Sequence, residues 1–133
     1  MTDNLENELK RIMKTPKITV DDLMNASGRA VRHNSDKIRY DLIPPLANKE
    51  YAKVWTVGAA KYEPRNWEKG MPYTEVIASA MRHLEAIRLG EDIDPEDGLL
   101  HAAHLMCNAA MLAEFHYTHP EFDDRVKYEK EVK

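Results

Sequence analysis

Residues 99–115 are apolar almost all the way round, which is typical of a helix buried at the centre of a domain. His101, His104 and Asn108 are polar side chains within this segment. Their spacing of three and four residues places them on one stripe of such a helix. Burying them costs free energy unless each finds a partner, and a metal ion, a phosphate group or a hydrogen-bond network could supply one. The segment therefore predicts both a central helix and a candidate site.

Apolar residues at helical spacing mark two further segments, 45–60 and 74–89, as amphipathic helices. Thr74 is the expected N-cap of the second. The run Asp-Pro-Glu-Asp that begins at Asp94 combines a capping residue, a proline and two acids, so it predicts a third helix over 95–116 with Asp94 as its N-cap. No segment shows the alternation that is typical of a strand. We expect an all-α bundle with three core helices.

The chain has 133 residues, enough for one domain with a hydrophobic core and too few for two ordinary ones. Residues 4–14 have the pattern of a short amphipathic helix, and 20–25 are compatible with one helical turn. We expect a single all-α domain, in which 1–27 form a peripheral helical arm, 28–116 the core and 117–133 a charged tail.

The composition argues against several classes of function. The net charge of −4 gives no basic patch, which argues against duplex nucleic acid as a partner. No apolar run approaches the ~20 residues that span a bilayer, and the polar, acidic N-terminus is unlike a signal peptide. Cys107 is the only cysteine, which favours a reducing compartment. We expect a cytoplasmic protein that forms a homodimer or homotetramer, because small all-α domains often complete their core by pairing.

A second histidine is expected to face the polar stripe. His83 lies at the border of the apolar stripe of the 74–89 helix, and the short connection that follows should make the two helices antiparallel neighbours. We therefore expect His83 to share a polar pocket with the candidate catalytic residues His101, His104 and Asn108. The alternative is that each is a buried polar side chain satisfied by a neighbouring helix.

Acidic residues between these two helices could bind a divalent cation through hard oxygen ligands. Glu91 and Asp94 are the candidates for metal contact, with His101 and His104 as further ligands. Against this, helix capping alone explains Asp94, whereas Glu91 has no such structural explanation. The zinc-protease motif is a poor match, because no glutamate follows His101.

The segment 61–67 combines cations, aromatic rings and an amide, so it can stack a base and hold phosphates. The triplet that begins at Arg39 is similar. The candidate substrate-binding residues are Arg39, Tyr40, Lys61, Tyr62, Arg65, Asn66 and Trp67. The alternative is a loop anchored by its tryptophan, with a solvated charged rim, and a structural clasp before the first core helix.

Six motifs in fixed order resemble one family, over residues 28–115. They are KIRYDLIPP at 37–45, GAAKY at 58–62, RNW at 65–67, RHL at 82–84, GEDIDPEDG at 90–98 and HAAHLMCN at 101–108. Together they resemble the phage dATP/dGTP diphosphohydrolases, which are grouped with the MazG-like, all-α nucleotide pyrophosphohydrolases.

The resemblance implies a MazG-like helical bundle that hydrolyses a purine deoxynucleoside triphosphate to the monophosphate and pyrophosphate with Mg²⁺ or Mn²⁺. It also implies a bacteriophage protein that acts in the host cytoplasm. The general MazG pattern places Glu-x-x-Glu on one helix and Glu-x-x-Asp on the next, whereas here the second helix carries His101 and His104. Either the loop acids replace those carboxylates, or imidazole ligands select a transition metal such as Mn²⁺, Zn²⁺ or Ni²⁺.

Two other functions stay open at this point. One is an HD-type phosphohydrolase, which also uses helical histidines, although the adjacent His-Asp pair of that class is absent. The other is a non-catalytic phage module that uses the same pocket to bind a nucleotide or a protein.

Overall fold

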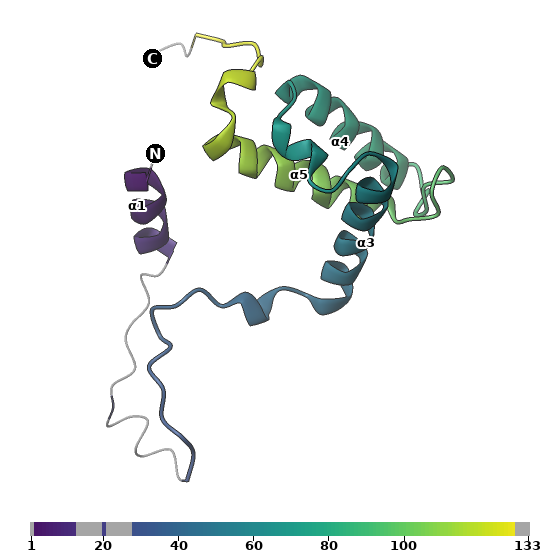
Figure 1. Ribbon diagram of the computed structural model, residues 1–133. Helices are drawn as coiled ribbons and strands as arrows, with labels where there is room; N and C mark the ends of the chain where they lie inside the picture. Colours follow the sequence, from purple (N-terminus) through teal and green to yellow (C-terminus); the bar gives the residue numbers. More distant parts are fainter. Residues whose placement is uncertain (1, 13–19, 21–27, 130–133) are drawn as a thin grey trace. The chain divides into compact units, whose positions relative to one another are not determined.

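A computed structural model describes residues 2–12, 20 and 28–129 (Figure 1). The chain forms two compact units, Met1–Ile43 and Pro44–Lys133. The described residues form helices and no strand, apart from one isolated bridge between Ile93 and Leu100, which confirms the all-α prediction. None of the helices in this part of the chain is both long and apolar enough to cross a membrane.

The first unit contains helix α1, Thr2–Ile12, and the 3₁₀ turn η1, Tyr40–Leu42. Helix α1 confirms the amphipathic helix predicted near the N-terminus, although it begins two residues earlier than expected. The last two residues of the predicted span, 13 and 14, lie outside the described residues. The helical turn predicted at 20–25 lies, apart from Val20, outside the described residues.

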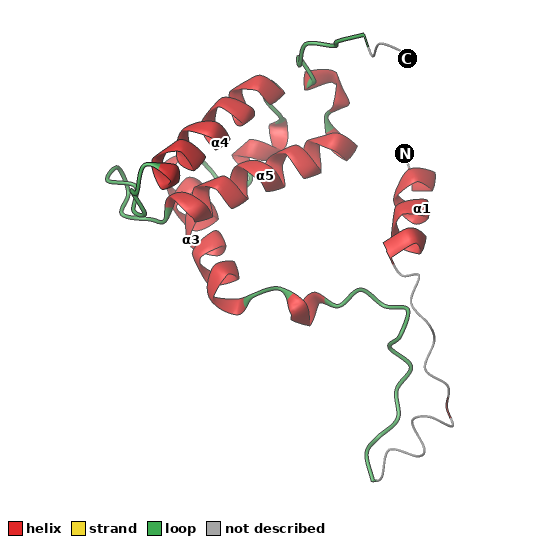
Figure 2. Cartoon of the chain, turned by 180° about the vertical axis from the view of Figure 1, so that it is seen from behind, coloured by secondary structure: helices red, strands yellow, loops and turns green. Residues whose placement is uncertain are grey.

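The second unit holds the core helices, with α5 packed against both α4 and α3 (Figures 1 and 2). Its elements are α3 (Pro45–Lys61), η2 (Asn66–Lys69), α4 (Tyr73–Arg88), α5 (His101–Thr118) and η3 (Pro120–Phe122). Helices α3 and α4 match the predicted spans 45–60 and 74–89 to within one residue at each end. Three core helices are therefore present, as the periodicity predicted.

The predicted start of the third core helix was wrong, because α5 begins at His101 rather than at residue 95. Asp94 does not cap this helix. Its Oδ1 accepts a hydrogen bond from the backbone N–H of Glu96, 2.9 Å away, and its backbone carbonyl accepts one from Gly98, 2.8 Å away. Aspartate favours such local turns for the same reason that it favours N-caps, since its short carboxylate reaches nearby N–H groups. The acidic run therefore forms a turn.

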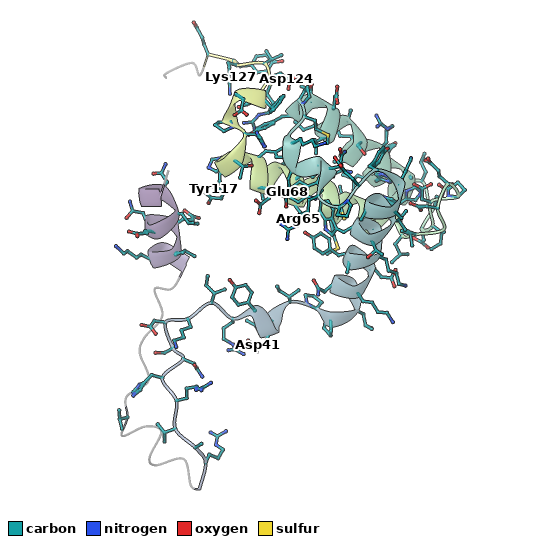
Figure 3. All side chains as sticks on the ribbon, viewed as in Figure 1. Asp41, Arg65, Glu68, Tyr117, Asp124 and Lys127 are labelled. Atoms are coloured by element: carbon teal, nitrogen blue, oxygen red, sulfur yellow. The ribbon has the colours of Figure 1, made fainter. Side chains whose placement is uncertain are left out.

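The N-terminus of α4 is capped from a distance. Thr74 was predicted to be the N-cap, but the helix begins at Tyr73, and Thr74 donates two hydrogen bonds to the carboxylate of Asp124. Its backbone N lies 2.9 Å from Oδ1 and its Oγ1 lies 2.5 Å from Oδ2 (Figure 3 labels Asp124). A carboxylate at this end of a helix also interacts favourably with the helix dipole.

We expect Asp124→Ala to lower the thermal stability at pH 7, because the first turn of α4 loses its hydrogen-bond acceptor. The bonds from Thr74 hold the pKa of Asp124 below its ordinary value of 3.8. A carboxylate whose pKa is lower in the folded state than in the unfolded state stabilises the fold at pH values above its unfolded-state pKa. That contribution is lost as the pH falls through the folded-state pKa. The difference in melting temperature between wild type and variant, followed by circular dichroism, should therefore shrink at pH 3. Glu129→Gln, a charge removal in the same segment, should show no such pattern.

The buried core joins α4 to α5. Tyr73, Val76 and Phe115 are almost fully enclosed, and the Tyr73 hydroxyl donates a 2.8 Å hydrogen bond to the Phe115 carbonyl. Phe122 of η3 packs against this cluster, so the start of the predicted charged tail belongs to the packed structure. This core fixes the register of α5 against α4 at one end, and the candidate site lies toward the other end of the same helix pair.

Candidate functional site

Three of the predicted site residues meet between α4 and α5. Nδ1 of His83 lies 2.9 Å from Nδ1 of His101, so one ring donates a hydrogen bond to the other. The rings of His83 and His104 are stacked and nearly parallel, with 4.6 Å between centroids and 4° between planes. We call these three residues the histidine cluster.

Acids of the 90–100 loop surround the histidine cluster. Glu91 Oε1 lies 2.7 Å from Nε2 of His101, the ring nitrogen that faces away from His83. Asp97 Oδ2 lies 2.7 Å from Nε2 of His104, and Asp94 Oδ2 lies 3.8 Å from the same atom. This buried nitrogen of His104 nevertheless has no hydrogen-bond partner of good geometry among the described residues. An orphaned buried nitrogen that faces two carboxylates is suited to a cation.

The two aspartates are held in place by the loop backbone. Asp94 uses Oδ1 to accept the N–H of Glu96, and Asp97 uses Oδ1 to accept the N–H of Leu99, each at 2.9 Å. Their Oδ2 atoms are the ones near His104. The turn that replaced the predicted helix start thus orients both carboxylates toward the histidine cluster.

The electrostatics of His83 favour a neutral ring. Burial lowers its pKa, and the charges of His104 and His101 lower it further, while Asp94 acts in the opposite direction. A neutral imidazole keeps a lone pair at neutral pH, which is the form that binds a metal or accepts a proton.

The residues present fit a divalent cation. Two groups of three side chains each place their ligand atoms within 4.8 Å of one another: His83, Asp94 and His101, and Asp94, Asp97 and His104. Imidazole nitrogen combined with carboxylate oxygen suits Mn²⁺ and other transition metals. Asp94, His101 and His104 were all predicted as metal ligands. Glu91 was predicted too, but it lies at the far nitrogen of His101, where a carboxylate orients a ligand.

Asn108 has a different partner. Its Nδ2 donates a 3.1 Å hydrogen bond to Oγ of Ser79 on α4, and the side chain is buried. No described contact joins it to the histidine cluster. The alternative interpretation of the sequence, a buried polar residue satisfied by a neighbouring helix, suits this position better than a catalytic role.

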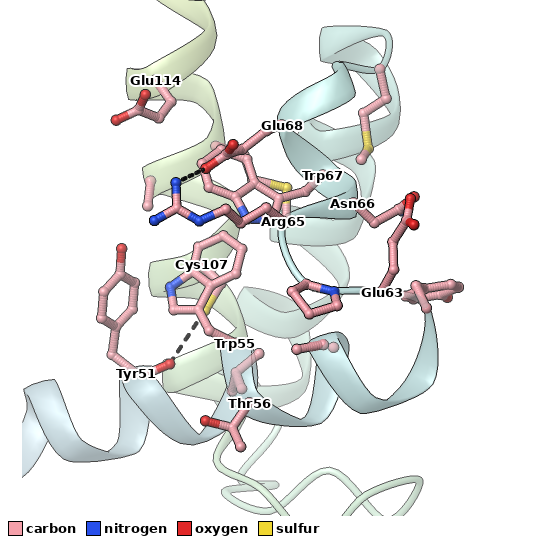
Figure 4. Close-up of a pocket in the computed structure, with 18 residues that line it drawn as sticks. Tyr51, Trp55, Thr56, Glu63, Arg65, Asn66, Trp67, Glu68, Cys107 and Glu114 are labelled. Atoms are coloured by element: carbon pink, nitrogen blue, oxygen red, sulfur yellow. Dashed lines mark hydrogen bonds and ion pairs between the residues drawn. The ribbon is translucent and has the colours of Figure 1, made fainter.

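An aromatic cleft of about 790 Å³ opens between α3, η2 and α5 (Figure 4). Trp55 and Trp67 form its centre, with ring centroids 4.8 Å apart. Its lining includes four of the predicted substrate-binding residues, Tyr62, Arg65, Asn66 and Trp67. None of the three clustered histidines lines it.

The charges of the cleft are mostly neutralised within it. Arg65 donates to Glu68 over 3.1 Å, and Lys69 pairs with Glu63 at the rim. Arg65 is also the only described non-glycine residue with a positive φ, 62°, a conformation that costs free energy. With its cation already paired and Glu114 on the opposite wall, the cleft suits an aromatic base better than a triphosphate.

Cys107 contributes to the wall of the cleft as a thiol. Its Sγ lies 3.7 Å from the carbonyl oxygen of Tyr51, and burial raises its pKa to about 12. It is therefore protonated at neutral pH and is no nucleophile.

The remaining predicted substrate-binding residues do not line the aromatic cleft. The amine of Lys61 is 3.9 Å from Glu96 and sits over the ring of Tyr62. Arg39 and Tyr40 belong to the first unit, where Arg39 forms a bidentate ion pair with Asp41 at 2.7 and 2.6 Å. Their contact with a substrate stays a prediction.

Asp97 was not among the predicted site residues. The acids that follow Asp94 were expected to form the start of the third core helix, and that helix begins at His101. The spacing between Asp97 and His104 matches no recognised motif, so the proximity of the two side chains is evident only from the folded turn.

Comparison with known proteins relates the chain to phage nucleotide hydrolases. The profile of a family described as dATP/dGTP diphosphohydrolase, N-terminal, matches residues 27–125. The chain belongs to this family. A curated relative from Salmonella phage PMBT28, named dATP/dGTP diphosphohydrolase, is 30% identical over 95 residues, which are 71% of this chain and 32% of the relative.

Family membership confirms the resemblance seen in the sequence, and the matched segment includes every candidate site residue. The chain spans about a third of the length of the relative from Salmonella phage PMBT28. No solved structure matches the chain.

Proposed function

We propose that this domain takes part in the metal-dependent hydrolysis of a purine deoxynucleoside triphosphate, dATP or dGTP, to the monophosphate and pyrophosphate. The observation that carries the proposal is the buried Nε2 of His104, which faces Asp94 and Asp97 without a hydrogen-bond partner among the described residues. The name of the phage relative supports the choice of substrate.

Cleavage between the α and β phosphates needs an attacking water, neutralisation of phosphate charge and a stabilised leaving group. A bound divalent cation supplies the positive charge and makes water a better nucleophile. Asp94, Asp97 and His104 would hold it. His83, which burial keeps neutral, is the candidate to accept a proton from the attacking water, and Glu91 orients His101 beside it.

The aromatic cleft is the proposed site for the base. Its tryptophans offer an aromatic face, and base–aromatic stacking contributes about 1–3 kcal/mol per base. Helix α5 carries both features, because Cys107 in the cleft wall follows His104 by three residues, a rise of about 4.5 Å. A nucleotide along α5 would then place its base in the cleft and its phosphates toward the histidine cluster.

The donor set favours Mn²⁺ over Mg²⁺ as the working metal. Mg²⁺ prefers an all-oxygen octahedron with several waters, whereas this cluster offers imidazole nitrogens together with carboxylates. We expect Mn²⁺ to support a higher rate than Mg²⁺ at equal concentration.

A second candidate function is a nucleotide-binding domain that hydrolyses nothing itself. One observation favours it: the helical carboxylates of the MazG pattern are absent from the sequence. The combination of imidazole and carboxylate metal ligands is also compatible with an HD-type phosphohydrolase, which is a third candidate function.

A panel of deoxynucleoside triphosphates with Mg²⁺ or Mn²⁺, read by product chromatography, separates these functions. We expect dATP and dGTP to give the monophosphate and pyrophosphate faster than the pyrimidine nucleotides do. Release of intact triphosphate and nucleoside would indicate the HD-type reaction. Binding of dGTP by folded, metal-loaded protein without any product would favour the binding domain.

A further inference from the structure

We propose that His119 is a positioning residue for the aromatic cleft: its ring bonds η2 to the end of α5 and so fixes Trp67 in the cleft wall. The inference deepens the proposed function and rests on it for the nature of the ligand, the base of a purine nucleotide. His119 itself does not line the cleft. It lies between α5 and η3, at the point where both elements contact η2 and the glycine that follows it.

The backbone of η2 has one described hydrogen bond to another element, and His119 makes it. Nε2 of His119 donates to the carbonyl oxygen of Glu68, 2.6 Å away. Every other described hydrogen bond of residues 63–70 stays within that segment. The ring of Trp67, the neighbour of Glu68, forms the centre of the cleft with Trp55 (Figure 4). The bond from His119 is therefore placed to fix one wall of the cleft.

Close packing fixes the imidazole ring itself. A Cβ on Gly70 would lie 2.9 Å from Cγ of His119, so the backbone at the end of η2 passes directly beside the ring. The ring also makes edge contacts with Phe115 and Phe122, whose centroids lie 5.6 and 5.5 Å away. Only 21% of the His119 side chain is exposed. The core thus holds the ring that bonds η2.

Both ring nitrogens of His119 face acceptors. Nδ1 lies 2.8 Å from Oε1 of Glu121, and Nε2 faces the carbonyl of Glu68. Neither oxygen has a proton to donate, so the two bonds need two N–H groups, which only the protonated imidazole has. Either tautomer of the neutral ring would turn a lone pair toward one of the oxygens. The hydrogen bonds to Glu121 and to the Glu68 carbonyl accordingly raise the pKa of His119 above its ordinary value of 6.5.

Glu121 is the charged side chain that acts on this ring. The charged side chains nearby on η2 and after η3 are paired among themselves: Arg65 with Glu68, Lys69 with Glu63, and Arg125 and Lys127 with Asp123. Glu114, His116 and Tyr117, in the last turns of α5, have no described contact with the His119 ring. The two bonds of His119 are thus present below pH 6.5 and are lost as the pH rises through its folded-state pKa.

Tryptophan emission tests this role without nucleotide, because the chain has two tryptophans and both line the cleft. The full chain without metal is titrated from about pH 5 to about pH 9. We expect the emission maximum to move to longer wavelength with a midpoint above 6.5, because η2 loosens and water reaches Trp67. Glu121→Gln, which removes the charge beside the ring, should lower the midpoint. His119→Gln should abolish the step, and His116→Gln, at an exposed histidine of the last turn of α5, should keep it.

Nucleotide affinity tests the consequence for the cleft. His119→Phe keeps an aromatic ring against the core but has no N–H group, so at about pH 6 we expect the dissociation constant for dGTP to rise about tenfold, the equivalent of ~1.4 kcal/mol. The amide of His119→Gln can donate to the Glu68 carbonyl and should restore the affinity to within about threefold. Because the histidine cluster is unchanged, KM should follow the dissociation constant while kcat stays within about twofold. A loss of stability alone would not produce this difference between KM and kcat.

An emission step that is absent from the wild type, or equal in His119→Gln, would overturn the proposal. Wild-type affinity for dGTP in a folded His119→Phe variant would overturn it too. Circular dichroism checks the fold, and if His119→Phe does not fold, the emission midpoints of Glu121→Gln and His119→Gln decide alone. Failure of the wild type to hydrolyse dGTP would refute the proposed function and not the role of His119, which the emission step decides without nucleotide. Hydrolysis without the emission step would do the reverse.

Discussion

Replacement of His104 with alanine is expected to lower kcat for dGTP with Mn²⁺ by more than about 100-fold, because loss of an outer-shell partner alone costs 10–100-fold. The same change should alter the free energy of unfolding by less than about 1.5 kcal/mol. Nε2 of His104 has no hydrogen-bond partner of good geometry in the described chain, so its removal breaks the ion pair with Asp97, 2.7 Å away, and the stacking on His83 rather than an aligned hydrogen bond. Steady-state kinetics and urea denaturation measure the two quantities.

The matched control is His116→Ala, an exposed histidine on the same helix that contacts only the ring of Tyr117 among the described interactions. It should leave both kcat and stability close to those of the wild type. A large loss of stability in His104→Ala with normal turnover would contradict the proposed role. The histidine would then be a core residue whose main contribution is its stacking on His83.

Gly70→Ala should cost the fold about 3 kcal/mol. Gly70 has φ 87° and ψ 158°, a conformation that is almost restricted to glycine and costs other residues about 1–3 kcal/mol. A Cβ at this position would also lie 2.7 Å from Cε2 of Phe122 and 2.9 Å from Cγ of His119. Overpacking of this kind typically costs about 1–3 kcal/mol more. Urea denaturation measures the total.

Gly90→Ala separates the two contributions to that cost. Gly90 also has a positive φ, 93°, but nothing lies within 4 Å of an added Cβ. It should therefore show the backbone cost alone, about 1–2 kcal/mol. Equal losses in the two variants would show that η2 and η3 move apart at no cost, against the close packing described here.

The core helices could be predicted because their signal is local and periodic. Apolar residues at helical spacing located α3 and α4, and three polar residues in an apolar segment drew attention to α5. The predicted N-terminal ends and caps of α4 and α5 were wrong, because the contact that decides each of them is distant in sequence or ambiguous. Asp124 caps α4 from 50 residues away, which no local pattern reveals. Asp94 is equally suited to an N-cap and to a turn, and only the packed loop decides between them.

The candidate site was predictable in part for the same reason. His83, His101 and His104 stand out as polar residues on apolar helix faces, and a short connection implies that the faces meet. Asn108 carries the same signal but bonds to Ser79, because one turn along α5 faces a different residue of α4. Periodicity locates a face of a helix; it does not identify the partner opposite each residue on it.

We propose that the cluster of histidines and aspartates serves metal-dependent hydrolysis between the α and β phosphates. The most direct test follows dGTP by anion-exchange chromatography with chelator-treated chain, before and after addition of Mn²⁺, for the wild type and for Asp94→Asn. We expect no turnover without metal, dGMP and pyrophosphate from the wild type with Mn²⁺, and neither product from the variant. Equal rates in wild type and variant, or turnover that persists without metal, would contradict it.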